Sequence, residues 1–199
     1  MDKNSKHKER MKNLKQQVDK GVAAATEQRG VCVLLTGDGK GKSTSAFGML
    51  MRSLGYGHKV AVVQFIKGKQ LSGEEIFLKE KYPEIPFFQM GTGFTWDSQD
   101  READIVAAKA TWEFAENLLQ DPEINLLILD ELTYMLAFDY LEEDSIIEAI
   151  QNRPMHQSVI ITGRGGGTAL RKIADTVTEN KNIKHAYDSG IQARKGVDF

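Results

Sequence analysis

The sequence predicts an α/β fold in which a mostly parallel sheet is covered by helices on both faces. Short apolar runs rich in Val, Ile and Leu alternate with longer amphipathic segments, which is the order expected of strands joined by helical crossovers. Glycine-rich turns follow two of these runs, at residues 37–41 and 163–167. With 199 residues and 41% hydrophobic content, the chain can bury one full core, so we expect one globular domain.

The bounds of the expected strands and helices follow from the spacing of apolar residues and from the positions of turn residues. Each expected strand is an apolar run between turn residues, and the expected helices carry apolar residues at helical spacing or stop at Gly or Pro. Gly55 ends one such helix, and another stops before Pro83. The expected strands are 31–36, 59–66, 86–90, 125–129 and 158–162, with 175–179 and 183–187 as two short final ones. The expected helices are 42–54, 74–81, 100–119, 132–138, 142–152 and a last one that ends near Ala174.

The first 27 residues form a charged arm that precedes the domain of residues 28–199. Seven basic side chains stand against three acidic ones in residues 1–20, and an Ala-rich stretch follows. The composition favours a helix, but its apolar face before Val22 is poor. From the segment alone we favour a mobile, solvated arm, and the alternative is a helix that becomes ordered against a partner subunit or a ligand.

Charge, cysteine content and hydropathy limit the possible partners. A net charge of −2 and a pI of about 6.1 differ from the basic character of most nucleic-acid binders, so we expect no nucleic-acid partner. No apolar stretch reaches the length of a membrane span and the polar N-terminus does not resemble a signal peptide, so we expect a cytoplasmic protein. Cys32 lies within an apolar run and is expected to be a buried, unreactive thiol.

A phosphate-binding loop lies between the first expected strand and the helix that follows it. Its glycines let backbone N–H groups converge on an anion, Lys42 adds a positive charge, and the Ser43 hydroxyl can reach Mg²⁺. Only three residues separate Gly37 from Gly41, one fewer than in the usual pattern. We expect a nucleotide to be bound by Gly37, Asp38, Gly39, Lys40, Gly41, Lys42, Ser43 and Thr44.

Three other segments near strand ends can complete this site. Asp130 and Glu131 follow an apolar run, and they could cap the next helix or reach Mg²⁺ or a ribose. Arg164 stands in the second glycine-rich turn, which could be a simple connection or could bring the guanidinium to the triphosphate. For Phe94 and Trp96, core packing and ligand contact are equally supported by the residues alone. All these loops fall at the carboxyl edge of a parallel sheet, where ligands bind.

The chain shows no nucleophile of its own. Its histidines, His7, His58, His156 and His185, are scattered, and no Ser–His–acid or Cys–His set stands out. Their spacing also gives no indication of a structural zinc site. The substrate itself is therefore expected to bring the nucleophile.

Six further motifs accompany the phosphate loop. They are Met-Gly-Thr-Gly-Phe-Thr-Trp at 90–96, Asp-Glu-Leu-Thr-Tyr at 130–134, Ile-Thr-Gly-Arg-Gly at 161–165, Ala-Asp-Thr-Val-Thr-Glu at 174–179, Lys-His at 184–185 and Gly-Ile-Gln-Ala at 190–193. Together they resemble the ATP:corrinoid adenosyltransferases of the phosphate-loop type, which act on cob(I)yrinic acid a,c-diamide or cob(I)alamin. The resemblance extends from about residue 28 to the C-terminus. One departure is Gly-Gly-Gly-Thr at 165–168, where a bulkier residue or a His is expected after Arg-Gly.

The resemblance implies a RecA-like phosphate-loop fold, a homodimer, and transfer of the 5′-deoxyadenosyl group of ATP to a cobalt(I) corrinoid. Cobalt(I) would then be the missing nucleophile, and inorganic triphosphate the leaving group. In this family the nucleotide is thought to lie reversed relative to kinases, with the shortened loop on the γ-phosphate. The loop with Lys42 and Mg²⁺ at Ser43 would hold the departing charge, and Glu131 and Asp130 would assist at the metal or the ribose.

The resemblance also implies roles outside the loop. Phe94 and Trp96 correspond to aromatic residues that cover the lower face of the corrinoid and exclude an axial ligand, which eases reduction of cobalt(II). The N-terminal arm is expected to cover the neighbouring subunit's site, and a reduced flavoprotein is expected as electron donor. The competing interpretations are an ordinary phosphate-loop NTPase or kinase and, third, a RecA-like nucleic-acid-binding module.

Overall fold

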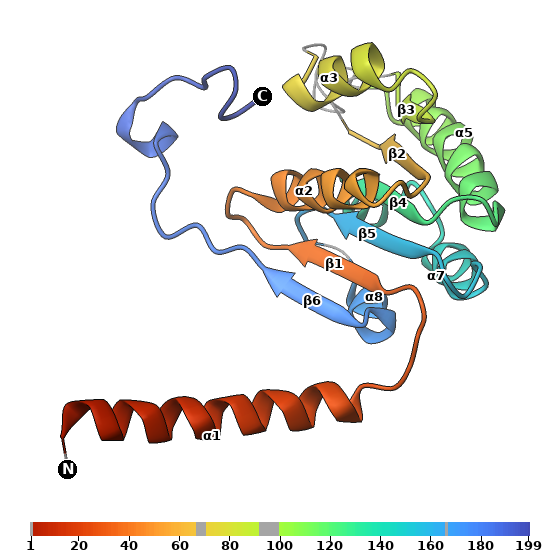
Figure 1. Ribbon diagram of the computed structural model, residues 1–199. Helices are drawn as coiled ribbons and strands as arrows, with labels where there is room; N and C mark the ends of the chain where they lie inside the picture. Colours follow the sequence, from red (N-terminus) through yellow and green to blue (C-terminus); the bar gives the residue numbers. More distant parts are fainter. Residues whose placement is uncertain (1, 67–70, 92–99, 166) are drawn as a thin grey trace.

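A six-stranded parallel sheet forms the centre of the fold (Figure 1). The computed structural model describes residues 2–66, 71–91, 100–165 and 167–199. Within them the strands pair in the order β3-β2-β4-β5-β1-β6, and every pairing is parallel. The prediction of a mostly parallel sheet is therefore confirmed. The strands are β1 Cys32–Thr36, β2 Val60–Gln64, β3 Phe87–Gln89, β4 Leu126–Asp130, β5 Ser158–Thr162 and β6 Thr176–Glu179.

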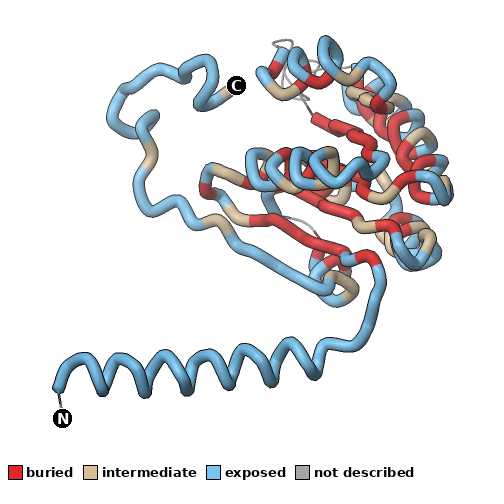
Figure 2. Tube along the Cα trace, viewed as in Figure 1, coloured by how far each residue is buried: buried red, intermediate tan, exposed pale blue. Residues whose placement is uncertain are grey.

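Helices cover both faces of this sheet, as predicted. Side chains alternate along each strand, so that Val33 and Leu35 of β1 join one core and Cys32 and Leu34 join the other. Figure 2 shows the buried residues gathered along the sheet and the inner sides of the helices. One face carries α2 (Lys42–Gly55) and α3 (Gly73–Lys81), and the other carries α5 (Arg101–Gln120), α6 (Thr133–Ala137), α7 (Glu143–Gln151) and α8 (Thr168–Ile173).

The last part of the chain departs from the prediction. The prediction of a strand at 183–187 is wrong, because this segment is irregular and leads into a 3₁₀ turn, η1 (Tyr187–Ser189). Ile183 is 88% exposed and Tyr187 is 77% exposed. Their β propensity is therefore not reinforced by packing against a sheet face, on which strand formation mainly depends.

The N-terminal arm forms a helix, α1 (Lys3–Ala24), in keeping with its helix-favouring composition. Every described residue of α1 is exposed, and Figure 1 shows the helix lying apart from the sheet. Met11, Leu14, Val18 and Val22 are spaced three and four residues apart, so they form one exposed apolar stripe. Neither α1 nor another helix in the described part of the chain has the length and apolar character needed to cross a membrane.

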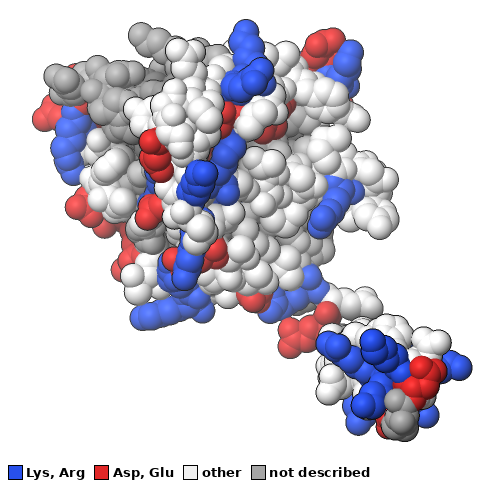
Figure 3. All heavy atoms as spheres, turned by 90° about the vertical axis from the view of Figure 1, so that its left-hand side faces the viewer, with Lys and Arg blue, Asp and Glu red and all other residues white. Residues whose placement is uncertain are grey.

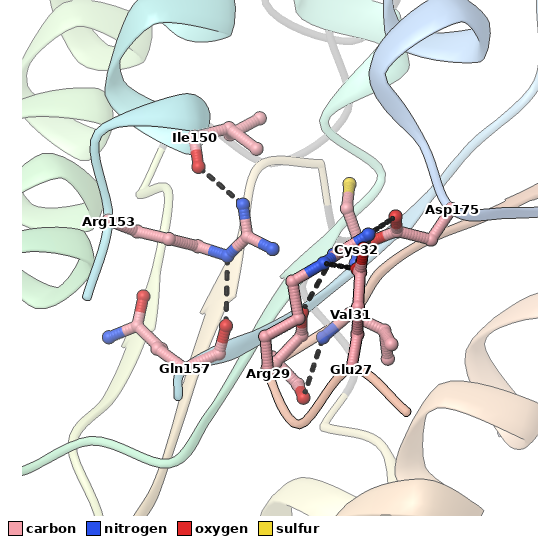
Figure 4. A network of polar contacts seen from close by, with 10 residues as sticks. Glu27, Arg29, Val31, Cys32, Ile150, Arg153, Gln157 and Asp175 are labelled. Atoms are coloured by element: carbon pink, nitrogen blue, oxygen red, sulfur yellow. Dashed lines mark hydrogen bonds and ion pairs between the residues drawn. The ribbon is translucent and has the colours of Figure 1, made fainter. Parts of the chain in front are cut away.

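An ion pair joins the segment after α1 to the start of β6 (Figure 4). The Arg29 guanidinium donates to both carboxylate oxygens of Asp175, at 2.6 and 2.9 Å, and the Cys32 backbone N–H donates to the same carboxylate at 2.8 Å. These hydrogen bonds, that of Arg29 first, lower the pKa of Asp175 to about 2. Cys32 itself is 1% exposed, and burial raises the pKa of its thiol to about 11. The prediction that the thiol is buried is confirmed, and a raised pKa favours its less reactive, protonated form.

Candidate functional site

The carboxyl ends of β1, β4 and β5 meet at one edge of the sheet, where the chain forms a cavity of about 550 Å³. On the face that carries this edge, basic and acidic side chains lie interleaved (Figure 3). The cavity brings together the phosphate loop, Glu131 and Arg164, whereas Asp130 is not among the residues that line it. Its lining comprises residues 39–44, 72–74, Glu131, Arg164, His185 and 196–199.

The phosphate loop is folded around its own lysine. The Lys42 ammonium donates to the backbone carbonyls of Gly37 at 2.7 Å and Gly39 at 2.9 Å, and Lys42 is only 5% exposed. Burial, with the nearby Arg164, lowers the pKa of Lys42, although the Glu131 carboxylate opposes this shift. Gly41, with a φ of 112°, precedes the first turn of the 14-residue helix α2. Residues 41–44 line the cavity, so the free N–H groups of this helix end lie beside it. The loop therefore presents a positive, anion-binding surface.

The segment after β6 supports this loop from outside. The Gly39 N–H donates to the Asn180 carbonyl at 2.7 Å, and the Asn180 side-chain amide donates to the Lys40 carbonyl at 3.2 Å. A Cβ on Gly37 would lie 2.4 Å from the Asn180 carbonyl oxygen, and one on Gly39 would lie 2.6 Å from the Lys181 carbonyl carbon. The close approach requires glycine at both positions. Further along, Asp198 pairs with Lys40 at 2.8 Å.

The two acidic residues after β4 occupy different environments. Asp130 is 1% exposed, and its carboxylate accepts hydrogen bonds from the Thr162 hydroxyl at 2.7 Å and the Gln64 amide at 2.9 Å. Glu131 lines the cavity and has a left-handed backbone with a φ of 61°. The carboxylate that faces the loop across the cavity is thus the one on Glu131.

The turn after β5 brings Arg164 to the same cavity. The Thr133 hydroxyl donates to the Arg164 carbonyl at 3.2 Å, and a Cβ on Gly163 would lie 2.0 Å from that hydroxyl oxygen. Glycine is therefore required at 163, where φ is 150°. Arg164 itself is exposed, as expected of a side chain that can reach an anionic ligand.

The aromatic pair Phe94 and Trp96 lies outside the described residues. The segment that precedes it is placed, because β3 ends at Gln89 and runs parallel to β2. Its carboxyl end therefore belongs to the same edge of the sheet as the cavity. The roles assigned to both rings stay predictions.

Several residues of this site were not singled out from the sequence. Gln64, Asn180 and the C-terminal residues 196–199 have no motif that marks them, and Thr162 lies in the motif at 161–165 but carries no predicted role there. Thr162 and Gln64 share one available signal, namely a polar residue at the end of an apolar run. Within the described residues, no group of three or more His, Cys, Asp or Glu side chains could hold a metal ion alone.

Fold and site together define a RecA-like, phosphate-loop nucleotide-binding protein. A profile of the family described as ATP:corrinoid adenosyltransferase BtuR/CobO/CobP matches residues 28–199. A corrinoid adenosyltransferase of Pseudomonas aeruginosa is 49% identical over 198 residues, which cover 100% of this chain and 98% of that protein. The corrinoid adenosyltransferase CobA of Salmonella typhimurium is 46% identical over 194 residues, and that of Escherichia coli 44%, each covering 98% of both chains.

The chain therefore belongs to the ATP:corrinoid adenosyltransferase family, whose enzymes transfer the adenosyl group of ATP to the cobalt of a corrinoid. The resemblance found in the motifs is confirmed.

Proposed function

We propose that this enzyme joins the 5′ carbon of ATP to the cobalt(I) of a corrinoid and releases inorganic triphosphate. Cobalt(I) supplies the electron pair of the new bond, and the bond from C5′ to the triphosphate oxygen breaks with its pair on that oxygen. The observation that carries this proposal is the phosphate loop, whose backbone and buried Lys42 line the cavity. Such a loop can bind a polyanion, and family membership indicates that the acceptor is a corrinoid.

The loop's task is to bind and orient the leaving group. The loop, Lys42 and Arg164 line the cavity, and in this proposal their N–H groups stabilise the charge that develops on the triphosphate as the bond breaks. Because Lys42 is buried against Gly37 and Gly39, its charge acts in a medium of low dielectric constant, where it stabilises the leaving group strongly. Asp38, Lys40 and Thr44 complete the proposed nucleotide contacts.

Mg²⁺ is the metal ion that this site fits best. Mg²⁺ in nucleotide enzymes is held by one or two protein oxygens together with substrate phosphates, and Ser43 and Glu131 line the same cavity. Bound there, the ion would neutralise part of the triphosphate charge. Asp130 is the other ligand that the sequence predicts. Its burial and its two hydrogen bonds favour Glu131 as the carboxylate that reaches the ion.

The remaining assignments concern the corrinoid and the partners. Phe94 and Trp96 are proposed to cover the lower face of the corrinoid, so that no axial ligand hinders reduction of cobalt(II) by a reduced flavoprotein. A homodimer is supported by the exposed apolar stripe of α1, which a second subunit would cover. We place the enzyme in the cytoplasm.

Anaerobic incubation with ATP, Mg²⁺ and chemically reduced cobalamin tests this function. We expect a light-sensitive adenosylated corrinoid and one equivalent of triphosphate. ADP and phosphate, formed without corrinoid, would instead identify an ordinary NTPase or kinase and would refute the proposal.

A further inference from the structure

We propose that Thr162 is a positioning residue, whose hydroxyl holds Glu131 in the conformation that aims its carboxylate at the phosphate site. Thr162 has not been assigned a role by its motif or by the family membership. The inference rests on the proposed function in one respect only, namely that Glu131 acts on Mg²⁺.

A chain of hydrogen bonds crosses three neighbouring strand ends. In register, Gln64 of β2 lies opposite Asp130 of β4, and Leu129 lies opposite Ile161, so that Asp130 and Thr162 are neighbours. The Gln64 amide and the Thr162 hydroxyl each donate to one oxygen of the Asp130 carboxylate, at 2.9 and 2.7 Å. Gln64 and Thr162 are 0% exposed and Asp130 is 1% exposed, so these bonds are protected from competition with water.

The direction of these hydrogen bonds determines that the Thr162 hydroxyl oxygen can act as an acceptor for a further donor. A hydroxyl has one hydrogen, and here it is committed to the carboxylate, which can only accept. The oxygen therefore presents a lone pair, and the Glu131 backbone N–H donates to it at 2.9 Å. Asp130 thus orients the hydroxyl, and the hydroxyl in turn holds the backbone of the next residue.

Glu131 needs this support because its backbone is strained. A non-glycine residue with a φ of 61° occupies a sparsely populated region, and such strain persists only where surrounding contacts enforce it. Glu131 directly follows β4 and lines the same cavity as Ser43. Without the bond to Thr162, this residue is expected to relax away from that position.

The test measures ATP binding, with and without Mg²⁺, in Thr162→Val and Thr162→Ser. Valine keeps the shape and removes the hydroxyl, whereas serine keeps it. We expect Thr162→Val to bind ATP about tenfold more weakly in Mg²⁺, the factor that loss of one hydrogen bond to a charged group gives. Binding in EDTA, which depends on the loop and Lys42, is expected to change less than about twofold. Thr162→Ser should restore the binding in Mg²⁺.

Three further variants separate positioning from general stability. In a Glu131→Gln background, Thr162→Val should add no further loss, because the carboxylate that it positions is already gone. Thr111→Val is the matched control, since Thr111 is 1% exposed and its hydroxyl donates to the Ala107 carbonyl within α5. It is expected to leave the response to Mg²⁺ unchanged. Gln64→Leu removes the other donor to Asp130 and should reproduce the loss specific to Mg²⁺, so the test does not depend on one variant folding.

Equal losses with and without Mg²⁺, or a Thr162→Val effect that persists in full beside Glu131→Gln, would overturn the inference. Both measurements omit the corrinoid. A failure here is therefore distinguishable from a failure of the proposed adenosyl transfer.

Discussion

At the scale of single residues, the site depends on a few residues that hydrogen bonds hold in place. The side chain of Lys42 is held by two loop carbonyls, that of Asp130 by two donors, and the backbone N–H of Glu131 by the Thr162 hydroxyl. Each of these groups is fixed before a ligand arrives. Pre-organisation of this kind lowers the cost of reorganising charge during the reaction.

Lys42→Ala is expected to lower kcat/KM about 100-fold, the loss typical of removing one group that stabilises developing charge. Because Lys42 acts on the triphosphate, the loss should be similar with cobalt(II) corrinoid plus reductant and with pre-reduced cobalt(I). Steady-state kinetics with both acceptors measures it. Lys109→Ala, an exposed lysine on α5, serves as control, and an undiminished rate in Lys42→Ala would contradict the role.

Trp96→Ala should behave differently. If the ring excludes an axial ligand from cobalt, the variant loses more turnover with cobalt(II) plus reductant than with chemically pre-reduced cobalt(I). The ratio of the two rates is the measurement. Equal losses in both assays would remove the proposed role in coordination.

Gly163→Ala is expected to destabilise the protein by about 2 kcal/mol or more, since overpacking and a strained φ add up. The new methyl group would meet the Thr133 hydroxyl at 2.0 Å and displace the Arg164 turn. Urea unfolding measures the change. Gly48→Ala is the contrast, because Gly48 lies in α2 with open space around it, and it should stabilise by about 0.5–1 kcal/mol. Equal effects at both positions would contradict the contact.

At the scale of elements, the segments at the two ends of the chain relate to the site in different ways. The segment after β6 lies against the phosphate loop, and Asn180 pairs with it through backbone and side chain. By contrast, α1 is wholly exposed and its apolar stripe is uncovered within one subunit. The segment after β6 supports the site of its own subunit, whereas we propose that α1 completes the site of a partner subunit.

A variant lacking residues 1–24 tests this proposal. Thermal unfolding of the domain should occur within about 2 °C of the wild type, because α1 buries no residue. Turnover with corrinoid should nevertheless fall, if the helix covers the neighbouring site. An unchanged rate would argue against that role, and a large loss of stability would show that α1 supports its own domain instead.

At the scale of the whole molecule, the stability depends on pH through Asp175. This carboxylate accepts three hydrogen bonds that join the segment after α1, β1 and β6, and its pKa falls to about 2. A depressed pKa stabilises the folded state above the unfolded pKa of about 4. That contribution is lost as the pH falls from about 4 towards about 2.

Asp175→Asn should therefore lower the free energy of unfolding at pH 7 by about 1–2 kcal/mol, from the weakened hydrogen bonds. It should also flatten the decline of stability below pH 4 relative to the wild type. Chemical denaturation across this range measures both effects. Glu80→Gln, in an exposed pair with Lys81, is the control and should change little. An unaltered acid profile in Asp175→Asn would refute the assignment.

The sequence by itself determined the parallel α/β fold, the phosphate loop, the acidic pair and the edge at which they meet. Local sequence patterns predict these features, such as the apolar runs of β1, β4 and β5 and the turn residues that follow them. Local patterns are readable because strand and helix periods arise from neighbouring residues. Hence the predicted elements, apart from 183–187, match the structure closely.

Only the tertiary structure decided which side chains meet across that edge. Thr162 and Glu131 are 31 residues apart, and Asn180 and Lys40 are 140 apart. Their contacts depend on strand order and register, which no local period encodes. Asp130 and Glu131 differ for a related reason, because β4 ends at Asp130 and Glu131 adopts a left-handed backbone held by a contact with Thr162. The sequence predicts a carboxylate pair at the site. The tertiary structure shows that Asp130 is buried, whereas Glu131 lines the cavity.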